Sequence, residues 1–146
     1  MKDYIKYEIS TFKIQFQYPE WWDDKIEYYD TYLFWDEYTG SFRITPTTID
    51  SPTFSLDQFL QNRFEEYAEK NPTWRTYNNR KYLYYEDFSK ENDGSTKLHF
   101  YISGQKNILL TCSFAYTKEL LEDEYSKDEV EVALEEVDNI LNSLTI

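Results

Sequence analysis

The sequence predicts an α+β fold, in which an antiparallel sheet carries amphipathic helices on both of its faces. Short segments with alternating apolar and polar residues recur along the chain, which is the pattern of half-buried strands. Two longer segments repeat apolar residues three and four positions apart, as amphipathic helices do. The later strand segments are apolar on both sides, so both faces of the sheet must be covered.

Two hairpins are predicted in the first third of the chain. In the first, strands at about residues 4–9 and 12–18 are joined by a short turn, and the apolar residues of 12–18 alternate with lysine and glutamine. In the second, strands at about residues 28–35 and 41–47 flank the segment DEYTG. Gly40 in this segment can adopt the positive φ that a hairpin bulge requires.

The first helix is predicted over residues 55–70. Ser55 can cap it by accepting a hydrogen bond from the amide of Gln58, and Phe54 and Phe59 occupy the positions of a hydrophobic staple. The helix should end before the Asn-Pro pair that follows, because a residue that precedes proline avoids the helical region.

The segment between the helices predicts a β-meander at about residues 73–88, with a break near Asn78-Asn79, then 97–103 and 107–116. Gly94 and Gly104 fall in the predicted turns between these strands. Together with Gly40 they account for all three glycines of the chain, so no glycine-rich loop remains that could cradle a phosphate.

The second helix is predicted over residues 126–144. Ser126 and Glu129 have the spacing of a capping box, and Tyr125 and Val130 occupy the staple positions. Its apolar residues repeat every three or four positions throughout, which makes this helix the best defined element of the sequence.

The segment FKIQFQYP and the tryptophan three residues after its proline give the chain a resemblance to a known fold group. Together with the hairpin, helix, meander and closing helix that follow, Tyr18, Pro19 and Trp22 resemble the PsbP and Mog-type fold group. The resemblance covers nearly the whole chain by order of elements. It implies an α/β/α sandwich formed by one domain, residues 1–146.

The same resemblance says little about activity, because one fold serves many functions. The group includes a photosystem extrinsic subunit, a Ran-binding factor, bacterial secretion chaperones and bacterial proteins without an assigned role. It brings no catalytic residues with it. The resemblance therefore places the chain among the bacterial members whose role the fold does not decide.

Two adjacent tryptophans follow Pro19. We expect Trp22 to be a core ring packed under the first hairpin, because a close-packed interior accommodates large aromatic rings. Trp21, which Glu20 precedes, is expected at the surface and is a candidate partner-binding residue.

The balance of charges restricts the classes of partner. The chain has 28 acidic and 15 basic residues, for a net charge of −13. This charge would repel the phosphates of nucleic acid and an anionic lipid surface, so neither nucleic acid nor a membrane is expected as a partner. It would attract a basic protein; acidity that only keeps the protein soluble is the alternative.

The acidic residues concentrate in the C-terminal third. Between residues 118 and 138, ten acidic residues stand against two lysines. Four of them are three or four positions apart and would form a stripe that faces away from the apolar side of the last helix: Asp128, Glu131, Glu135 and Asp138. Like charges at these spacings each destabilise a helix by about 0.2–0.5 kcal/mol. We therefore predict that these four residues bind a basic partner; a merely solvated face is the alternative.

The sequence contains no recognisable catalytic or metal-binding constellation. The single histidine, His99, shares a strand face with Lys97 and Tyr101 and is expected at the surface or at the rim of the sheet. The single cysteine, Cys112, falls on an apolar strand face, where a thiolate would be disfavoured. One histidine and one cysteine cannot form a usual zinc site. We therefore expect no catalytic residue, no metal and no other cofactor.

These observations favour a non-enzymatic protein-binding domain, immunity-like or chaperone-like, for a basic partner. The alternative is small-molecule binding in an aromatic-lined pocket between the sheet and a helix, because aromatic residues make up 20% of the chain. A single cysteine cannot form an internal disulfide and the polar start of the chain lacks the apolar region of a signal peptide, so a cytoplasmic location is expected. No apolar run approaches the roughly 20 residues of a membrane-spanning helix. The oligomeric state is left open.

Overall fold

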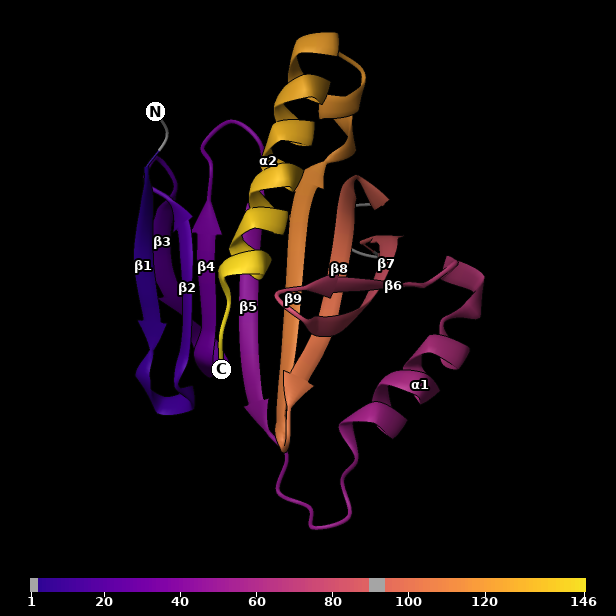
Figure 1. Cartoon of the computed structure of the whole chain (residues 1–146). Coiled ribbons are helices and arrows are strands. Elements are labelled where there is room, and N and C mark those ends of the chain that lie inside the picture. Colours follow the sequence, from indigo (N-terminus) through magenta and orange to yellow (C-terminus); the bar gives the residue numbers. More distant parts are fainter. Residues whose placement is uncertain (1–2, 90–93) are drawn as a thin grey trace.

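The computed structural model describes residues 3–89 and 94–146. Within these residues the chain forms a seven-stranded sheet, a separate two-stranded hairpin and two α-helices (Figure 1). All neighbouring strands of the large sheet are antiparallel. The predicted α+β class with an antiparallel sheet is therefore confirmed.

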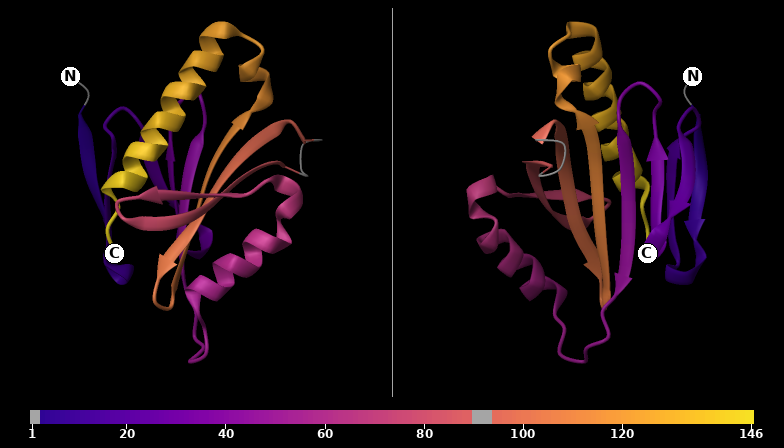
Figure 2. Two further views of the ribbon diagram at one scale, coloured as in Figure 1. Left: turned by 45° about the vertical axis from the view of Figure 1, so that its right-hand side comes forward. Right: turned by 180° about the vertical axis from the view of Figure 1, so that it is seen from behind.

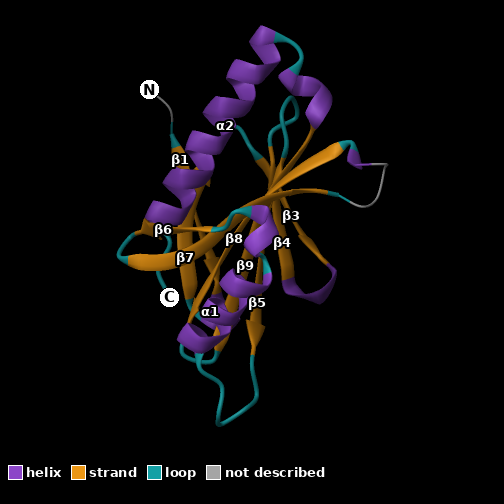
Figure 3. Cartoon of the chain, turned by 90° about the vertical axis from the view of Figure 1, so that its right-hand side faces the viewer, coloured by secondary structure: helices purple, strands orange, loops and turns teal. Residues whose placement is uncertain are grey.

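The large sheet places the last strands of the sequence between the early and the middle ones. In their order across the sheet, its strands are β3 (Asp23–Glu27), β4 (Thr31–Trp35), β5 (Ser41–Thr48), β9 (Ile108–Thr117), β8 (Thr96–Gln105), β7 (Arg80–Phe88) and β6 (Thr73–Tyr77). The right-handed twist of neighbouring strands accumulates across a sheet of this width. As a result, β6 runs nearly across the direction of β4 (Figures 1 and 3).

The N-terminal hairpin, β1 (Tyr4–Ile9) and β2 (Ile14–Pro19), does not join the large sheet. It forms a second layer over one end of that sheet, where the rings of Phe16 and Tyr18 lie 5.3 and 4.8 Å from the ring of Phe34 in β4. The alternating pattern of the sequence predicts the two strands. It does not show that they leave the sheet, because a strand in either layer buries one face.

The C-terminal tail closes the free edge of β2. Gln15 and Thr145 exchange two backbone hydrogen bonds of 3.0 and 2.8 Å. The amide of Gln17 also donates to the hydroxyl oxygen of Ser143 at 2.8 Å. These bonds hold the end of the last helix against the hairpin.

Residues 23–35 differ from the single strand predicted at 28–35. β3 is an additional strand at the edge of the sheet, and β4 begins only at Thr31, after a 3-10 turn in which Asp30 has a φ of 56°. β3 is missed because its sequence, DDKIE, shows no apolar face. Charged residues of this kind protect the edge of a sheet from pairing with other chains.

Helix α1 (Leu56–Glu66) begins where it is predicted. The hydroxyl oxygen of Ser55 accepts a hydrogen bond from the amide of Gln58 at 3.3 Å. The rings of Phe54 and Phe59 lie 5.9 Å apart, as a hydrophobic staple requires. The α-helix stops before the predicted end at residue 70, and the chain continues as a 3-10 turn.

Helix α2 (Glu124–Ser143) begins ahead of the predicted start at Ser126. Its cap is Asp123, whose carboxylate accepts a hydrogen bond from the amide of Ser126 at 3.0 Å. Aspartate caps a helix as well as serine does, and its charge adds a favourable interaction with the helix N-terminus. The staple predicted between Tyr125 and Val130 is wrong, because Tyr125 lies inside the helix with 74% of its surface exposed.

The two helices lie on opposite faces of the sheet, as predicted. Along β7, Tyr82 and Tyr84 point into the core that contains the apolar side of α2. The alternate residues Leu83 and Tyr85 point into the core that contains α1. Successive residues of a strand point to opposite faces, so the two cores lie on either side of the sheet. The larger core takes from α2 the side chains of Val130, Ala133, Val137, Ile140 and Leu141.

Helix α1 covers only part of its face of the sheet (Figure 2). It packs on β6, β7 and β8, where Leu83, Tyr85 and Ile102 are buried. Over β5 and β9 the same face carries hydroxyl side chains, such as the cross-strand pair Thr45 and Thr111. The helices thus cover both faces of the sheet, as predicted, although α1 does not extend over this hydroxyl-bearing part of its face.

Two glycines allow backbones to approach closely, and neither acts as predicted. Gly40 does not have a positive φ; a Cβ atom there would lie 2.3 Å from the carbonyl oxygen of Ala115. Gly104 lies within β8 rather than in a turn, and a Cβ atom there would lie 2.1 Å from the carbonyl oxygen of Ile108. The turn that follows uses Lys106, with a φ of 54°.

Candidate functional site

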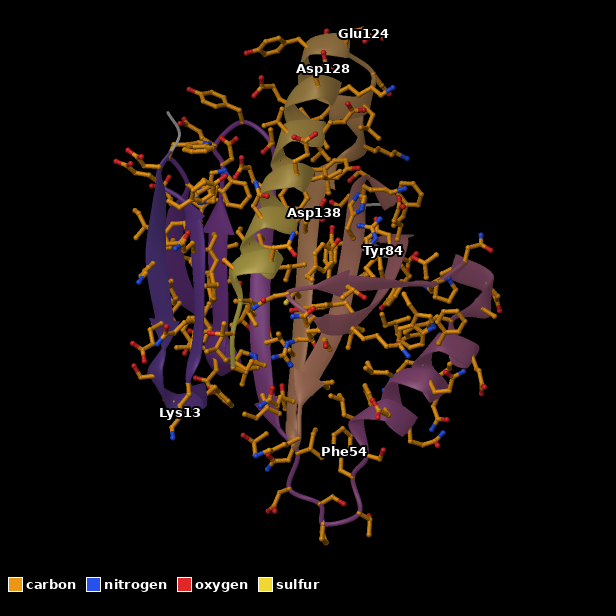
Figure 4. The ribbon with its side chains drawn as sticks, in the orientation of Figure 1. Lys13, Phe54, Tyr84, Glu124, Asp128 and Asp138 are labelled. Atoms are coloured by element: carbon orange, nitrogen blue, oxygen red, sulfur yellow. The ribbon has the colours of Figure 1, made fainter. Side chains whose placement is uncertain are left out.

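The outer side of α2 is acidic. Asp128, Glu131 and Glu135 are exposed at intervals of three and four residues, and we call them the acidic ridge. Figure 4 shows Asp128 near the end of the helix that begins at Glu124. The helix has seven acidic residues and one lysine, and none of the ion pairs between described residues involves it. The ridge therefore presents negative charge to the solvent without a salt-bridge partner from the described part of the chain.

Asp138, the fourth residue of the predicted acidic stripe, has a different role. It is half-buried, and its carboxylate accepts a hydrogen bond from the hydroxyl of Tyr77 at 2.7 Å. The guanidinium of Arg75 donates to the same hydroxyl at 3.2 Å. Burial, and then the bond to Asp138, raise the pKa of Tyr77 to about 12. Asp138 thus connects α2 to β6. It reaches the sheet because it lies at the edge of the predicted stripe.

The pattern of α2 also contains an acidic residue that the sequence analysis does not single out. Glu136 is only 6% exposed, and its carboxylate accepts a hydrogen bond from the hydroxyl of Tyr4 at 2.6 Å. The amide group of Asn139 donates to the same hydroxyl at 3.3 Å. Its place directly before Val137, in the apolar stripe, is the signal that could have identified it as buried.

The two tryptophans occupy the environments that the sequence predicts. Trp22 is 4% exposed and stacks on Phe114, with 6.4 Å between the ring centroids. Trp21 is 43% exposed and lies beside Tyr4, also with 6.4 Å between the centroids. Trp22 therefore belongs to the core. The part of Trp21 in binding a partner stays a prediction.

His99 is buried, so its predicted position at the surface or rim of the sheet is wrong. It is 5% exposed and lies between two tyrosines, with Nδ1 2.6 Å from the hydroxyl of Tyr84 and Nε2 3.1 Å from that of Tyr116. The strand face that looks polar in the sequence is the one that packs towards α2. Burial lowers the pKa of His99 to about 4. The imidazole is therefore neutral at pH 7 and is engaged at both nitrogens.

The guanidinium of Arg75 lies 3.5 Å from the centre of the Tyr84 ring. This contact and the bond to Tyr77 fix the position of the Arg75 charge. Burial is the main cause of the lowered pKa of His99; the carboxylate of Glu86 opposes it, and the positive charges of Lys97 and Arg75 add to it. Figure 4 labels Tyr84, which lies on β7, and Asp138, which lies on α2.

Cys112 is fully buried on an apolar strand face, as predicted. Burial raises the pKa of its thiol, so the nucleophilic thiolate is disfavoured. Among residues 3–89 and 94–146, no three histidine, cysteine, aspartate or glutamate side chains gather as a metal site would require. In the same residues, no helix combines the length and the apolar character needed to cross a membrane.

The small-molecule alternative requires an aromatic-lined pocket between the sheet and a helix. A hollow of about 270 Å³ lies between α1 and the sheet, and its lining contains leucine, polar and charged side chains without an aromatic ring. A hollow of about 460 Å³ lies beside the N-terminal hairpin, and only Tyr7 and Phe16 contribute rings to it. On the α2 side, the rings of Tyr77, Tyr82 and Tyr101 pack edge to face within the core. Most of these aromatic residues thus fill the interior, and two exposed tyrosines line a further hollow beside the first turn of α2.

Comparison of the sequence with known families gives one assignment. Residues 2–143, nearly the whole chain, match the model of the family DUF3805, which is described as a domain of unknown function. No curated protein matches the sequence.

The fold is shared with solved structures, three of which are informative. A crystal structure of a protein from Bacteroides thetaiotaomicron has a TM-score of 0.64 at 20% identity, over 90% of this chain and 44% of that one. The chain thus spans less than half the length of that relative. The solution structure of CyanoP, the cyanobacterial PsbP from Synechocystis, has a TM-score of 0.63 at 14% identity, over 100% of this chain and 94% of that one. The Ran-binding protein Mog1p of Saccharomyces cerevisiae has a TM-score of 0.58 at 10% identity, over 100% and 96% of the two chains.

Identities this low carry information about the fold only, and at that level the resemblance to the PsbP and Mog-type group is confirmed. The match over residues 2–143 shows that the chain belongs to the DUF3805 family.

Proposed function

We propose that this protein is a non-enzymatic binding domain that docks a basic protein through the acidic ridge of α2. The observation that carries the proposal is the exposure of Asp128, Glu131 and Glu135 on one helix without a salt-bridge partner among the described residues. Because a single cysteine cannot form an internal disulfide, we place this function in the cytoplasm as part of the proposal.

The arrangement of the ridge has a cost to the free protein. Asp128 and Glu131, and then Glu131 and Glu135, are neighbours on the helix surface, and each such pair of like charges destabilises a helix by about 0.2–0.5 kcal/mol. A basic surface would remove this repulsion on binding. It would also be steered towards the ridge, because a field of one sign raises the rate of encounter with an opposite charge.

The interior of the protein supports a role without catalysis. The side chains best suited to act as a base or a nucleophile, His99 and Cys112, are both buried. The imidazole is engaged by two tyrosine hydroxyls, and the thiol has a raised pKa. Neither group is therefore available to a substrate in solution.

The structural neighbours offer a limited analogy. Mog1p, which has the same fold, is a Ran-binding protein, so this fold can serve protein recognition. At 10% identity the analogy does not extend to Ran or to any named partner. For this chain we propose a basic partner, either an effector that the domain neutralises in the manner of an immunity protein or a client that it holds as a chaperone.

Affinity capture from the native cell, at low and then at high salt, tests this function. The bait variant carries Asp128→Asn, Glu131→Gln and Glu135→Gln. Its matched control carries Asp57→Asn, Glu65→Gln and Glu69→Gln, which makes the same change in net charge at exposed residues in and just after α1, on the other side of the sheet.

The wild-type domain and the α1 control should both retain a basic protein at low salt and release it at high salt. The ridge variant should retain much less of it. Equal capture by all three baits, or capture of acidic or neutral proteins only, would contradict the proposal.

A further inference from the structure

We propose that a notch between the β4–β5 turn and the first turn of α2 receives the side chain of a lysine or arginine of the partner. The notch is a hollow of about 330 Å³ lined by Tyr38, Tyr125, Ser126 and Glu129, and we call it the aromatic notch. The inference rests on the proposed function, because it specifies how the basic partner of α2 is recognised.

The aromatic notch brings together two rings from distant parts of the sequence. Tyr38 lies in the turn between β4 and β5, which stands beside the upper half of α2 (Figures 1 and 2). The exposed fractions of Tyr38 and Tyr125 are 76% and 74%. Neither ring belongs to an aromatic pair of the described residues, although such pairs are abundant elsewhere in the protein. Exposed aromatic rings beside a hollow are typical of contact residues in protein interfaces.

The turn that carries Tyr38 is held in place. The backbone amide of Tyr38 donates a hydrogen bond to Oδ1 of Asp36 at 3.2 Å. The backbone amide of Asp36 donates to the carbonyl oxygen of Gly40 at 3.1 Å. Gly40 itself lies so close to Ala115 that any side chain would clash with that carbonyl. The turn is therefore anchored to β9, in the centre of the sheet.

The other wall of the notch is equally ordered. Tyr125 and Ser126 lie in the first turn of α2. The carboxylate of Asp123 accepts a hydrogen bond from the amide of Ser126, and its backbone carbonyl accepts one from the amide of Lys127 at 2.8 Å. Both tyrosines therefore lie in backbone segments that hydrogen bonds hold in place before a partner binds. Preorganisation of this kind reduces the entropy that is lost on association.

The charges around the notch select a cation. Glu129 is half-buried at the hollow, with the exposed Asp128 of the ridge next to it. The only lysine of α2, Lys127, is two residues from both Tyr125 and Glu129 and therefore projects from the opposite side of the helix. A lysine or arginine side chain can lie over the faces of tyrosine rings while its charged end donates to a carboxylate. The carboxylate of Glu129, the one charged side chain among the lining residues, would repel an anion.

The continuity of the notch with the ridge favours a protein as the source of the cation. The notch takes one side chain, and the neighbouring acids of α2 can contact further basic residues of the same surface. A small cation would use the notch alone and would leave the ridge solvated.

Titration of the folded domain with short peptides, followed by NMR of the tyrosine rings and backbone amides, tests the inference. The probes are blocked pentapeptides with one arginine or one lysine between glycines, and the control peptide has glutamine in that place. We expect saturable shifts of the Tyr38 and Tyr125 signals with the two cationic peptides and none with the glutamine peptide.

Variants then assign the contact. Tyr38→Ala, Tyr125→Ala and Glu129→Gln should each weaken binding of the arginine peptide by about threefold to tenfold. Tyr28→Ala is the matched control, because Tyr28 is 89% exposed but lies beside the edge strand β3. This variant should bind as the wild type does. The backbone amide spectra establish that each variant is folded.

Two results would overturn the inference. The first is an equal response to the glutamine peptide, and the second is unchanged binding by both Tyr38→Ala and Tyr125→Ala. If the notch variants then bind the captured partner normally while the ridge variant does not, the inference fails and the proposed function stands. If the ridge variant also binds normally, the proposed function fails as well.

Discussion

Tyrosine supplies much of the core on the α2 side, and each buried ring brings a hydroxyl group that must be accommodated. Tyr84 and Tyr116 share His99, and Tyr77 is held between Asp138 and Arg75. The hydroxyl of Tyr82, by contrast, is buried without a hydrogen-bond partner among the described residues. Tyrosine rings in similar surroundings therefore differ in how much their hydroxyl groups contribute to the stability of the fold.

Removal of a single hydroxyl from two of these rings tests this difference. Tyr84→Phe leaves Nδ1 of His99 without its partner and should lower the free energy of unfolding by about 1–3 kcal/mol. Tyr82→Phe removes a hydroxyl group without a hydrogen-bond partner among the described residues. It should lower the free energy of unfolding by less than about 0.5 kcal/mol, or raise it. Urea unfolding measures both variants, and each is the control for the other. Equal losses would show that the Tyr84–His99 bond contributes nothing particular.

The adjacent tryptophans form a second matched pair. Trp22→Ala should lower the free energy of unfolding by about 3–5 kcal/mol, because the cavity lies in the core beside Phe114. Trp21→Ala should lower it by about 1 kcal/mol or less, because the ring is partly exposed. Thermal or urea unfolding of the two variants checks this, and a larger loss for Trp21 would reverse the assignment of core and surface.

His99 should make stability depend on pH. Its folded pKa of about 4 is below the unfolded value of about 6.5, so the unfolded chain takes up the proton first as the pH falls. Its contribution is complete above about pH 6.5 and is lost towards pH 4, by up to about 3 kcal/mol. Urea unfolding between pH 7.5 and 4.5 should show this slope in the wild type and a shallower one in His99→Gln.

Most carboxylates titrate alike in both of these proteins, so their difference reports on His99 together with Glu86, the carboxylate whose charge acts on it. NMR adds a direct check, because a chain with one histidine gives one set of imidazole signals. A titration midpoint near 6.5 would contradict the buried, neutral imidazole.

At the scale of elements, α2 combines three surfaces. Its apolar side packs on the sheet, Glu136 and Asn139 bind Tyr4 of the hairpin, and the acidic ridge faces the solvent. Asp138 lies at the boundary between the ridge and the sheet. The acidic residues of one helix therefore divide into those that hold the fold together and those that do not.

Stability measurements separate these two groups of acidic residues. The ridge variant, Asp128→Asn with Glu131→Gln and Glu135→Gln, should differ from the wild type by less than about 0.5 kcal/mol at low salt, because it loses two like-charge pairs and also the attraction between Lys127 and Glu131, four residues apart on α2. Asp138→Ala should be less stable by about 1–3 kcal/mol, because the hydroxyl of Tyr77 loses its acceptor. A ridge variant that loses as much as Asp138→Ala would mean that the ridge is part of the fold.

The elements with strong periodic patterns could be predicted, and those defined by their neighbours could not. Both helices follow from their apolar spacing, although Asp123 takes the capping role expected of Ser126. β3 has no apolar face, so only its pairing with β4 identifies it as a strand. The position of His99 depends on which face of the sheet α2 covers, and no local pattern contains that information.

The same limit applies to the candidate site. The exposed ridge follows from helical spacing, because residues three and four apart share a side of the helix. The aromatic notch depends on the β4–β5 turn meeting the first turn of α2, and these segments are far apart in the sequence. From the sequence, Tyr125 is predicted to be a staple residue, because its exposure depends on where the helix starts.

At the scale of the whole molecule, charge and fold have separate consequences. The sandwich that the chain shares with CyanoP and Mog1p positions α2 on the sheet, with one side towards the solvent. The seven acidic residues and one lysine of α2 are a property of this sequence and make that side negative. In the proposed function, the fold supplies the exposed side of α2 and its acidic residues supply the charge that would attract a basic partner.

The most direct test of this account is the association rate of the captured partner with three forms of the domain, measured by stopped flow from low to high salt. The wild type and the α1 control should associate rapidly at low salt and slow down steeply as salt is added. The ridge variant should associate more slowly and depend less on salt, because the charges that steer the encounter are gone. If the ridge variant and the α1 control instead show the same rate and the same salt dependence, then net charge alone acts on the encounter and α2 is not the docking surface.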